Sequence, residues 1–379
     1  MYILIVSRGC PSKKYKMNGI FEFDQAKALA KAGNKVVYAA IDLRSLRRKR
    51  KWGFEEFEKD GVSVQAINLP CGRIPRFLMD KMRIIAFSKL YEHIEKKYGK
   101  PDIIHAHFIH FGYSTACLFD KSKIPLILTE HYSGMNQIEI DPYLLKLGSY
   151  TYPRMHKVIS VGKHLAINLK EKFGLEEIII PNIVDVSSFK FRDVSKQSND
   201  FNFISTGSLT KNKRMDILIK SFYNAFEVDN NKKLYIYGEG SERSNLEKII
   251  RNYRLENNVF LMGLVDRKEI ANKMCECDCF VLVSELETFG VAYIEAMAMG
   301  LPVIATRCGG PEDFVNIKNG LLVSVDNIAE ITNSLISIYQ NINHYNKKII
   351  SDLTINEFGS QTITNKLSKL YTKILNSRE

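Results

Sequence analysis

Two glutamates, Glu287 and Glu295, combine residue type and spacing in a way that could do chemistry. Glu287 immediately precedes Thr288-Phe289-Gly290, where a helix is expected to begin, and Glu295 lies eight residues beyond Glu287. The free N–H groups at a helix start favour an anion such as a phosphate, and carboxylates accept hydrogen bonds from hydroxyl groups. At this spacing the two carboxylates can lie roughly 10 Å apart. The arrangement therefore suits a molecule with both phosphate and hydroxyls, such as a nucleotide sugar.

The residues around the two glutamates predict a strand, a helix and a second strand. Residues 279–283 are a short apolar run, which is typical of a buried strand. Val291, Ile294 and Met297 recur at helical spacing, and residues 301–305 begin the next apolar run. The spacing of the glutamates is weak evidence by itself, because a plain helix with one solvated glutamate has the same pattern.

The sequence that follows carries a family resemblance. After the two glutamates come Gly300-Leu-Pro-Val303, the turn Gly309-Gly310 and Asn319-Gly-Leu-Leu-Val323, in this order. This ordered set resembles the donor domain of the retaining glycosyltransferases of family 4. The resemblance implies the GT-B fold, in which two Rossmann-like domains with doubly wound parallel sheets face each other. It also implies transfer of a hexose from a nucleotide sugar, expected to be a UDP-sugar, with retention of configuration and without a metal or other cofactor.

The resemblance assigns roles to residues at the start of this helix. Glu295 would hold the ribose hydroxyls of the donor. Glu287, with the amides of Phe289 and Gly290, would hold hydroxyls of the donor sugar and phosphate. Thr288 belongs to the same helix start and is expected to contact the donor too.

Further donor-binding residues are expected elsewhere. Lys213 matches a lysine that offsets charge on the leaving diphosphate, but the usual arginine partner is Ser208 here. Gly263 follows a strand whose end would meet the base. His131 ends a strand on the ligand side and would contact the sugar, and Gly19 would let backbone amides approach a phosphate. The expected catalytic residues are His131, Lys213 and Glu287; an exposed loop lysine at 213 and a plain helix-entry turn at Gly19 are the alternatives.

The length of 379 residues suggests two domains of comparable size. Apolar runs alternate with helical stretches, which predicts an α/β fold with parallel sheets. The expected strands are 2–6, 36–40, 62–67, 103–106, 125–129 and 157–161, then 201–207, 233–237, 259–262, 280–283, 303–306 and 321–325. We expect an acceptor-binding domain over residues 1–186 and, after a polar linker, a donor-binding domain over residues 201–355. A C-terminal helix over residues 356–379 is expected to cross back to the first domain.

Two clusters of metal-ligand residue types occur. His105, His107 and His110 lie close together, but the first two alternate along an expected strand, and no glutamate or cysteine completes a recognised set. Residues 275–279 hold three cysteines without the spacing of chelating pairs, and the last begins a buried strand. We therefore expect hydrogen-bonded histidines, core cysteines and no metal site.

The formal net charge of +12 is concentrated in the first half. Residues 1–190 contain 31 Lys and Arg against 19 Asp and Glu, whereas the remainder contains 23 of each. The densest basic segment ends in the single tryptophan and suits an anionic membrane surface. Its expected contact residues are Arg44, Arg47, Arg48, Lys49, Arg50, Lys51 and Trp52. A solvated basic loop is the alternative, and no nucleic-acid partner is expected, because no recognised binding motif accompanies the charge.

The cellular location follows from what the sequence lacks. No apolar run approaches the roughly 18 residues that cross a bilayer, and residues 1–6 resemble a buried strand rather than a signal peptide. Seven cysteines without a signal agree with a reducing compartment. We expect a cytoplasmic protein, peripheral at the inner face of the membrane, that acts on a glycan or lipid-linked acceptor in polysaccharide biosynthesis.

Two other functional classes remain open at this point. A nucleotide-sugar epimerase shares the twin-domain architecture but would convert the donor without any acceptor. A non-catalytic binding protein on the same scaffold would tolerate loss of Glu287 or Lys213, and the serine at position 208 keeps this alternative open.

Overall fold

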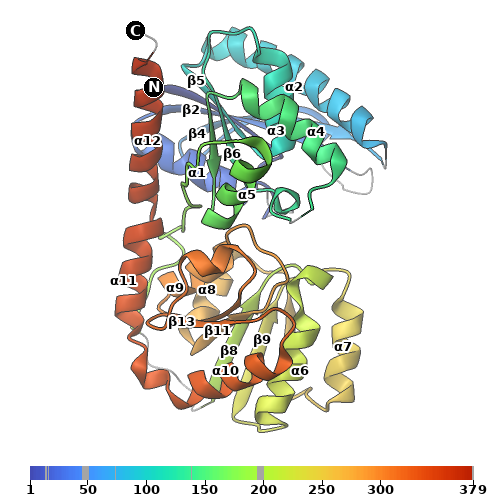
Figure 1. Ribbon diagram of the computed structural model, residues 1–379, viewed down its shortest axis with the longest axis vertical. Coiled ribbons are helices and arrows are strands. Elements are labelled where there is room, and N and C mark those ends of the chain that lie inside the picture. The colour runs from blue at the N-terminus through green and yellow to red at the C-terminus, as the bar shows by residue number, and fades with distance from the viewer. Residues whose placement is uncertain are drawn as a thin grey trace. The chain divides into compact units, whose positions relative to one another are not determined.

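The computed structural model describes residues 1–12, 15, 17–44, 51–72, 74–137, 139–193 and 200–377. The chain divides into two compact units (Figure 1). The first unit combines residues 1–183 with residues 360–379, and the second unit comprises residues 184–359. Each unit is a largely parallel β-sheet flanked by helices, so the expectation of two Rossmann-like α/β domains is confirmed.

The first unit alternates strands and helices along most of its length. Its strands are β1 (Tyr2–Ser7), β2 (Lys35–Arg44), β3 (Gly53–Lys59), β4 (Val62–Pro70), β5 (Ile103–His107), β6 (Leu126–Glu130) and β7 (Lys157–Ser160). Its helices are α1 (Ile20–Lys31), α2 (Arg76–Tyr98), α3 (Ile109–Phe119), α4 (Pro142–Thr151), α5 (Lys163–Phe173) and α12 (Ser360–Asn376). The strands lie in the order β3-β4-β2-β1-β5-β6-β7.

The edge strand β3 is the part of this sheet that the sequence pattern did not predict. It runs antiparallel to β4, and Phe54 lies opposite Ile67 in the register. The two strands are joined at Asp60 and Gly61, which have φ angles of 52° and 79°. Two consecutive positive φ angles are what a tight two-residue hairpin turn requires. β3 therefore begins directly after Trp52 and is joined to β4 by a tight turn.

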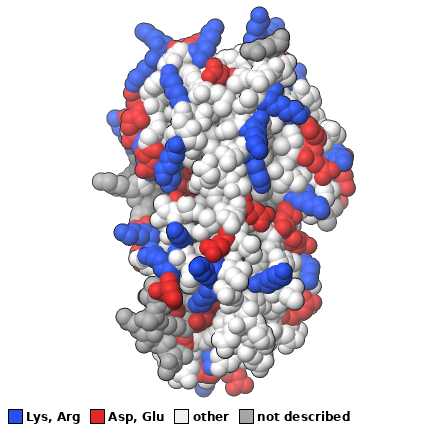
Figure 2. Space-filling view, turned by 90° about the vertical axis from the view of Figure 1, so that its left-hand side faces the viewer, with Lys and Arg blue, Asp and Glu red and all other residues white. Residues whose placement is uncertain are grey.

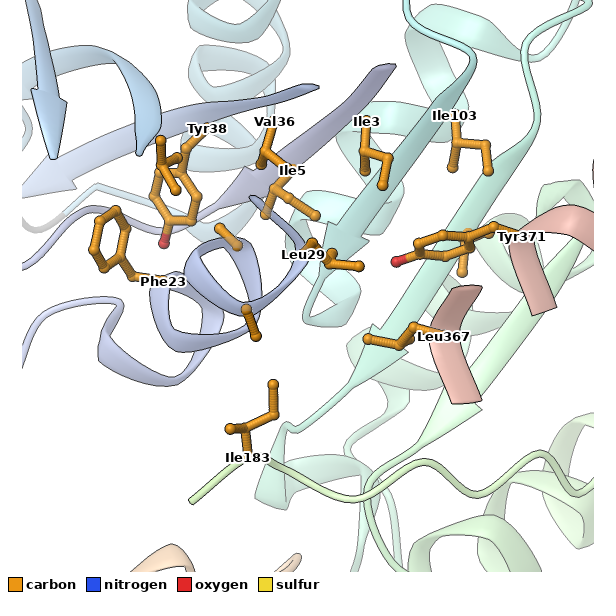
Figure 3. Close-up of a cluster of buried hydrophobic side chains, with 14 of the residues drawn as sticks. Ile3, Ile5, Phe23, Leu29, Val36, Tyr38, Ile103, Ile183, Leu367 and Tyr371 are labelled. Carbon is orange, nitrogen blue, oxygen red and sulfur yellow. The ribbon is translucent and has the colours of Figure 1, made fainter. Parts of the chain in front are cut away.

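The core of the first unit includes the C-terminal helix. Ile3, Ile103 and other inward side chains of the sheet pack against Leu29 of α1 and against Leu367 and Tyr371 of α12 (Figure 3). All five of these side chains are fully buried. Helix α12 is therefore part of the hydrophobic core of the first unit. It begins 177 residues after Ile183, where the N-terminal segment of that unit ends.

The second unit repeats the alternation. Its strands are β8 (Phe201–Thr206), β9 (Lys232–Tyr237), β10 (Val259–Gly263), β11 (Cys279–Leu282), β12 (Val303–Thr306) and β13 (Gly320–Val323). Its helices are α6 (Met215–Phe226), α7 (Arg243–Asn252), α8 (Arg267–Cys275), α9 (Val291–Ala298), α10 (Ile328–Gln340) and α11 (Lys347–Phe358). The strand order is β10-β9-β8-β11-β12-β13, and every neighbouring pair is parallel.

The beginning of the expected interdomain linker is packed against the second unit. The N–H of Val184 donates to the carbonyl of Phe358 at 2.9 Å, and that of Phe191 donates to the carbonyl of Ala298 at 2.9 Å. The Phe189 side chain between them is fully buried. These contacts place residues 184–191 with the second unit.

Two surface properties bear on a membrane partner. Within the described part of the chain, no helix is both long and apolar enough to span a bilayer. On the face that carries α12, blue Lys and Arg side chains of the first unit are separated by white and red ones (Figure 2). This face of the first unit therefore carries mixed charge rather than one continuous basic surface.

Candidate active site

Glu287 is held in an extended loop after β11 by backbone pairing with the loop after β12. Its N–H donates to the carbonyl of Cys308 at 3.0 Å, and its carbonyl accepts the N–H of Gly310 at 3.0 Å. A Cβ atom at Gly310 would lie 2.4 Å from the backbone of Phe289. The Gly-Gly turn is therefore needed for the close approach of these two loops, which fixes the position of Glu287.

The carboxylate of Glu287 contacts the side chain of Lys213. The Lys213 Nζ atom lies 2.5 Å from Glu287 Oε1, and the Ser284 hydroxyl donates to the same oxygen at 2.8 Å. The side chains of Lys213 and Glu287 are only 19% and 12% exposed. Lys213 ends a short 3₁₀ helix, Lys211–Lys213, that follows β8. An ammonium group and a carboxylate are thus fixed at the carboxyl edge of the sheet, where ligands of such folds bind.

The other cations near Lys213 are oriented differently. Arg214 forms ion pairs with Glu285 and Asp326, each at 2.9 Å. Lys211 and Ser208 are exposed. Of the cations at positions 211, 213 and 214, Lys213 is the one that pairs with a sequence-predicted site residue.

Glu295 lies on α9 and is paired with an arginine that sequence reasoning did not identify. Arg267 Nε lies 3.0 Å from Glu295 Oε1, and Arg267 Nη2 donates to the same oxygen. The guanidinium also lies over the Phe189 ring, 5.2 Å from its centroid. Arg267 stands at the start of α8, where Asp266 caps the helix by accepting the N–H of Glu269. Both partners are largely buried, so this pair is less screened than a surface salt bridge.

The residues between the two glutamates have distinct places. Gly290 precedes α9 with a φ of 94°, a conformation that favours glycine. The Phe289 side chain is buried against Phe314 and Phe358, so only its backbone is available to a ligand. Thr288 is partly exposed. The helix start is therefore built as the sequence predicted.

Gly263 ends β10 next to the turn after β9. Its carbonyl accepts the N–H of Gly238 at 2.9 Å, and its φ is 76°. A Cβ at Gly238 would lie 1.8 Å from the carbonyl oxygen of Gly207, the residue after β8. The loops after β8, β9 and β10 thus pack backbone to backbone at the same edge as Lys213 and Glu287.

Gly19 and His131 belong to the first unit. Gly19 precedes α1 with a φ of 67°, and a Cβ there would lie 2.0 Å from the carbonyl oxygen of Gly9. The Tyr38 hydroxyl donates to that carbonyl at 2.9 Å. Glycine is therefore required at position 19 by the close approach of the loop after β1, whatever it binds.

His131 follows β6 and is partly exposed. Its Nε2 atom lies 2.9 Å from Nδ1 of His107, and the two rings stack at 5.2 Å. Burial, with the nearby charge of Arg8, lowers the pKa of His131 to about 3. The ring is therefore neutral at physiological pH. His110 lies apart, with Nδ1 3.7 Å from Asp80.

The arrangement of the described histidines and cysteines bears on whether they could hold a metal ion. In the ranges that the structure describes, no group of three or more His, Cys, Asp or Glu side chains is arranged to hold a metal ion. The cysteines at 277 and 279 are buried.

The basic segment is only partly described. Arg47, Arg48, Lys49 and Arg50 lie outside the described residues. Arg44 Nε lies 2.5 Å from Asp42 Oδ1, and the Arg44 side chain is only 19% exposed. Trp52 is 37% exposed and Phe54 is 51% exposed. Arg44 is therefore held in an ion pair with Asp42 at the end of β2, whereas the side chains of Trp52 and Phe54 are accessible to a partner.

The backbone that carries His131 is anchored by a buried carboxyl group. Glu130 Oε1 accepts the N–H groups of His131 and Tyr132 at 3.0 and 2.9 Å, and Oε2 accepts the Tyr152 hydroxyl at 3.1 Å. Burial nevertheless raises the pKa of Glu130 to about 7. The native protein therefore holds this proton over a pH range in which the unfolded chain, with a pKa of about 4.3, has lost it.

Replacing Glu130 by glutamine should flatten the dependence of stability on pH. Because the folded pKa is the higher one, Glu130 lowers the free energy of unfolding as pH rises from about 4.3 to 7. Between pH 5 and 8 this loss amounts to about 2–3 kcal/mol, and Glu130→Gln should lack it while keeping the oxygen acceptor. Urea unfolding at pH 5 and at pH 8 measures this difference in the free energy of unfolding for wild type and for Glu130→Gln. The exposed Glu171→Gln is the control. Equal pH dependence in wild type and Glu130→Gln would contradict the assignment.

Comparison with known proteins gives the family. The model of Glycosyltransferase Family 4 matches residues 23–188, and the model of Glycosyl transferases group 1 matches residues 187–350. An uncharacterized glycosyltransferase of Methanocaldococcus jannaschii is 32% identical over 250 residues, which cover 63% of this chain and 66% of that protein. The N-acetyl-alpha-D-glucosaminyl L-malate synthase of Bacillus anthracis is 25% identical, covering 72% and 75%. The alpha-monoglucosyldiacylglycerol synthase of Acholeplasma laidlawii is 26% identical, covering 76% and 78%.

Solved structures share the fold. Sucrose-phosphate synthase from Thermosynechococcus elongatus superposes with a TM-score of 0.82 at 19% identity, over 100% of both chains. Anabaena HepE in complex with UDP superposes with a TM-score of 0.73 at 16% identity, over 98% of this chain and 99% of that one. Taken with the two family models, which together span residues 23–350, these similarities show that the chain belongs to the group 1 glycosyl transferases of family 4 and is a glycosyltransferase with the GT-B fold.

Proposed function

We propose that this glycosyltransferase moves a hexose from a UDP-sugar, with retention of configuration, to a hydroxyl of a glycan or lipid-linked acceptor in polysaccharide biosynthesis. The observation that carries the proposal is the Lys213–Glu287 pair, fixed at 2.5 Å beside the start of α9. A cation there can offset the charge that grows on a leaving diphosphate, and such electrostatic stabilisation often supplies the largest part of an enzyme's rate enhancement.

The second unit binds the donor in this proposal. Glu295 accepts hydrogen bonds from the ribose hydroxyls, next to its partner Arg267. Glu287 and the backbone amides of Phe289 and Gly290 hold the sugar hydroxyls and the phosphate at the start of α9. Gly263 borders the base. Lys213 moves from Glu287 toward the phosphate as charge develops there.

The first unit binds the acceptor and supplies His131, which hydrogen-bonds a substrate oxygen. Attack on the same face as the departing phosphate, with that phosphate assisting, gives retention without an enzymic nucleophile. A metal is not needed for this chemistry, since Lys213 and the helix start supply the positive potential. The UDP bound by HepE and the diacylglycerol in the name of the Acholeplasma relative support the choices of nucleotide and acceptor class.

The donor proposal is tested by calorimetric titration of UDP, GDP and ADP in the presence of EDTA. Wild-type protein should bind UDP selectively at micromolar concentration. Glu295→Ala should weaken UDP binding by about 30-fold or more, because the ribose loses a charged acceptor worth about 2 kcal/mol. Glu247→Ala, which removes another ion-paired glutamate of the second unit, should bind as wild type. Equal binding by Glu295→Ala would remove the ribose assignment, and no binding of UDP by wild type would refute the donor.

The membrane proposal concerns the basic segment and the aromatic residues that follow it. Lys51 and Trp52 are exposed, and Phe54 is exposed on β3. Cations beside exposed aromatic side chains attract an anionic lipid surface, so we place the protein at the inner face of the cytoplasmic membrane. Sedimentation with vesicles that contain anionic lipid should fall several-fold when residues 47–51 are replaced by glutamine, and further when Trp52 becomes serine. Sedimentation equal to that with neutral vesicles would contradict membrane binding.

A further inference from the structure

A row of hydrogen-bonded polar side chains crosses one face of the first sheet and ends at His131. His105 and His107 lie two residues apart on β5, so both point to the face that α1 and α12 cover. His105 Nδ1 lies 2.6 Å from the Tyr371 hydroxyl of α12, and its Nε2 lies 2.7 Å from the Thr129 hydroxyl. Figure 3 shows Tyr371 against this face of the sheet. The histidine row is defined here as His105, His107 and His131.

The amide of one α1 residue joins the first two histidines. Gln25 Nε2 lies 3.4 Å from Nδ1 of His105 and 3.4 Å from Nε2 of His107. His107 Nδ1 then lies 2.9 Å from Nε2 of His131. Both ring nitrogens of His105 and both of His107 are therefore engaged, with Gln25 as the partner that the two rings share.

The row is uncharged. His105 and His107 are fully buried, and their rings stack at 4.7 Å. Burial lowers the pKa of His105 to about 3 and that of His107 well below its ordinary value. A neutral imidazole has one N–H donor and one bare nitrogen that accepts. The direction of each hydrogen bond therefore decides which nitrogen carries the proton.

The partners of His105 set the direction at one end. Gln25 Nε2 carries two hydrogens and no lone pair for acceptance, so Nδ1 of His105 is bare. Its single lone pair accepts chiefly from the buried Tyr371 hydroxyl at 2.6 Å, and Gln25 at 3.4 Å is the weaker donor to the same nitrogen. His105 then carries its proton on Nε2 and donates to Thr129. If the oxygen and nitrogen of the Gln25 amide exchanged places, His105 would carry hydrogen on Nδ1, between Gln25 Oε1 and the Tyr371 hydroxyl oxygen. The Tyr371 proton would then lose Nδ1 as its acceptor, which is costly in a buried site.

The same amide sets the direction at the other end. Nε2 of His107 accepts from Gln25, so His107 carries its proton on Nδ1 and donates it to Nε2 of His131. Nε2 of His131 is then an acceptor, and its proton lies on Nδ1. The Asn182 side chain also hydrogen-bonds His131. Because Nε2 is engaged by His107, this bond falls on the Nδ1–H, so a substrate oxygen shares that hydrogen with Asn182.

We propose that Gln25 and Tyr371 are positioning residues that hold His131 as its neutral Nδ1–H tautomer, so that it serves a substrate oxygen as a hydrogen-bond donor and not as a base. The role toward substrate rests on the proposed function, whereas the tautomers are a property of the first unit alone. His131 has no basic lone pair to offer, because Nε2 is already used by His107.

The tautomers can be measured by nitrogen NMR on protein labelled with ¹⁵N at histidine, because the shift of a ring nitrogen that carries hydrogen differs from that of a bare one. Single His→Gln variants assign the resonances. At pH 7 we expect hydrogen on Nδ1 of His131 and His107 and on Nε2 of His105. Gln25→Met should convert His107 and His131 to mixtures of tautomers. Gln65→Met, which removes a buried glutamine that bonds Tyr98 instead, should change none of them.

The outcomes separate the two claims. A charged or Nε2–H His131 in wild type, or unchanged tautomers in Gln25→Met, would overturn the proposal. In a transfer assay kcat of Gln25→Met should fall about two- to tenfold with KM for the donor unchanged, because only the fraction with the productive tautomer reacts. Wild-type protein that shows the expected tautomers but transfers no sugar would refute the proposed function and leave the tautomer assignment standing.

Discussion

Replacing Lys213 by methionine should lower kcat for sugar transfer by about 10²- to 10³-fold, while the KM for the donor changes far less. Methionine keeps most of the apolar stem and removes the ammonium group that lies 2.5 Å from Glu287. The leaving phosphate carries more charge in the transition state than in the bound donor, so a cation that offsets this charge acts mainly on kcat. Steady-state kinetics with the UDP-sugar that binds wild type measures both constants.

Lys211→Met is the matched control for this prediction. Lys211 lies in the same 3₁₀ helix but is exposed, so its replacement should leave kcat within about twofold, as expected for a surface change. An equal loss of activity in Lys211→Met and Lys213→Met would show that kcat depends on the overall positive charge of this loop and not on Lys213 in particular. Full activity in Lys213→Met would favour the alternative that this position carries an ordinary surface lysine.

Replacing Glu287 by glutamine should weaken binding of a UDP-hexose by about 10- to 100-fold and leave binding of UDP almost unchanged. The amide keeps the shape of the side chain but loses the charge that accepts hydrogen bonds from sugar hydroxyls, and such charge-assisted bonds contribute about 1.5–3 kcal/mol each. UDP lacks the sugar, so it does not depend on this group. Calorimetric titration of UDP and UDP-hexose into the same variant compares the two ligands directly.

The neighbouring Glu285→Gln is the control for Glu287→Gln. Glu285 is exposed and pairs with Arg214 at 2.9 Å, so its replacement should alter neither titration. Loss of UDP binding in Glu287→Gln would show that Glu287 serves the nucleotide rather than the sugar. The variant Glu295→Ala should lose both ligands, which distinguishes the two glutamates.

Much of the fold could be predicted because parallel strands that are buried on both faces are continuous apolar runs. The apolar runs at residues 279–283 and 303–306 predict strands, and both contain strands of the second sheet. β3 does not follow this rule, because it lies at an edge and its two phenylalanines, Phe54 and Phe57, are separated by two glutamates, which gives neither an apolar run nor a strict alternation. Asp60-Gly61 has the sequence of a two-residue hairpin turn, and it is the one local signal of the β3–β4 hairpin.

The site was partly predictable for a related reason. Glu287 and Glu295 share one loop and helix, so their relation is local in sequence. Lys213 and Glu287 are 74 residues apart, and only the family resemblance brought them together. Nothing in the sequence around Arg267 indicates that it belongs to the site, since an arginine at a helix start is ordinary. Its contact with Glu295 exists because α8 and α9 follow strands whose ends lie at one sheet edge.

The contact between His105 and Tyr371 could not be inferred from local pattern at all, because 266 residues separate the two side chains. Each residue has an ordinary sequence environment, a strand for one and a helix for the other. Their proximity depends on the return of the chain to the first unit after the whole second unit is complete.

That return has a consequence for synthesis on the ribosome. The second unit is continuous, so it can fold once residue 359 has emerged. Residues 1–183 of the first unit are made before the second unit, but this unit lacks Leu367 and Tyr371 of its core until the second unit has been made. Nascent chains therefore expose apolar surface of the first sheet throughout elongation, at about 5–20 residues per second. Domains usually fold in the order of synthesis; here the first unit completes its core only after the second unit has been made.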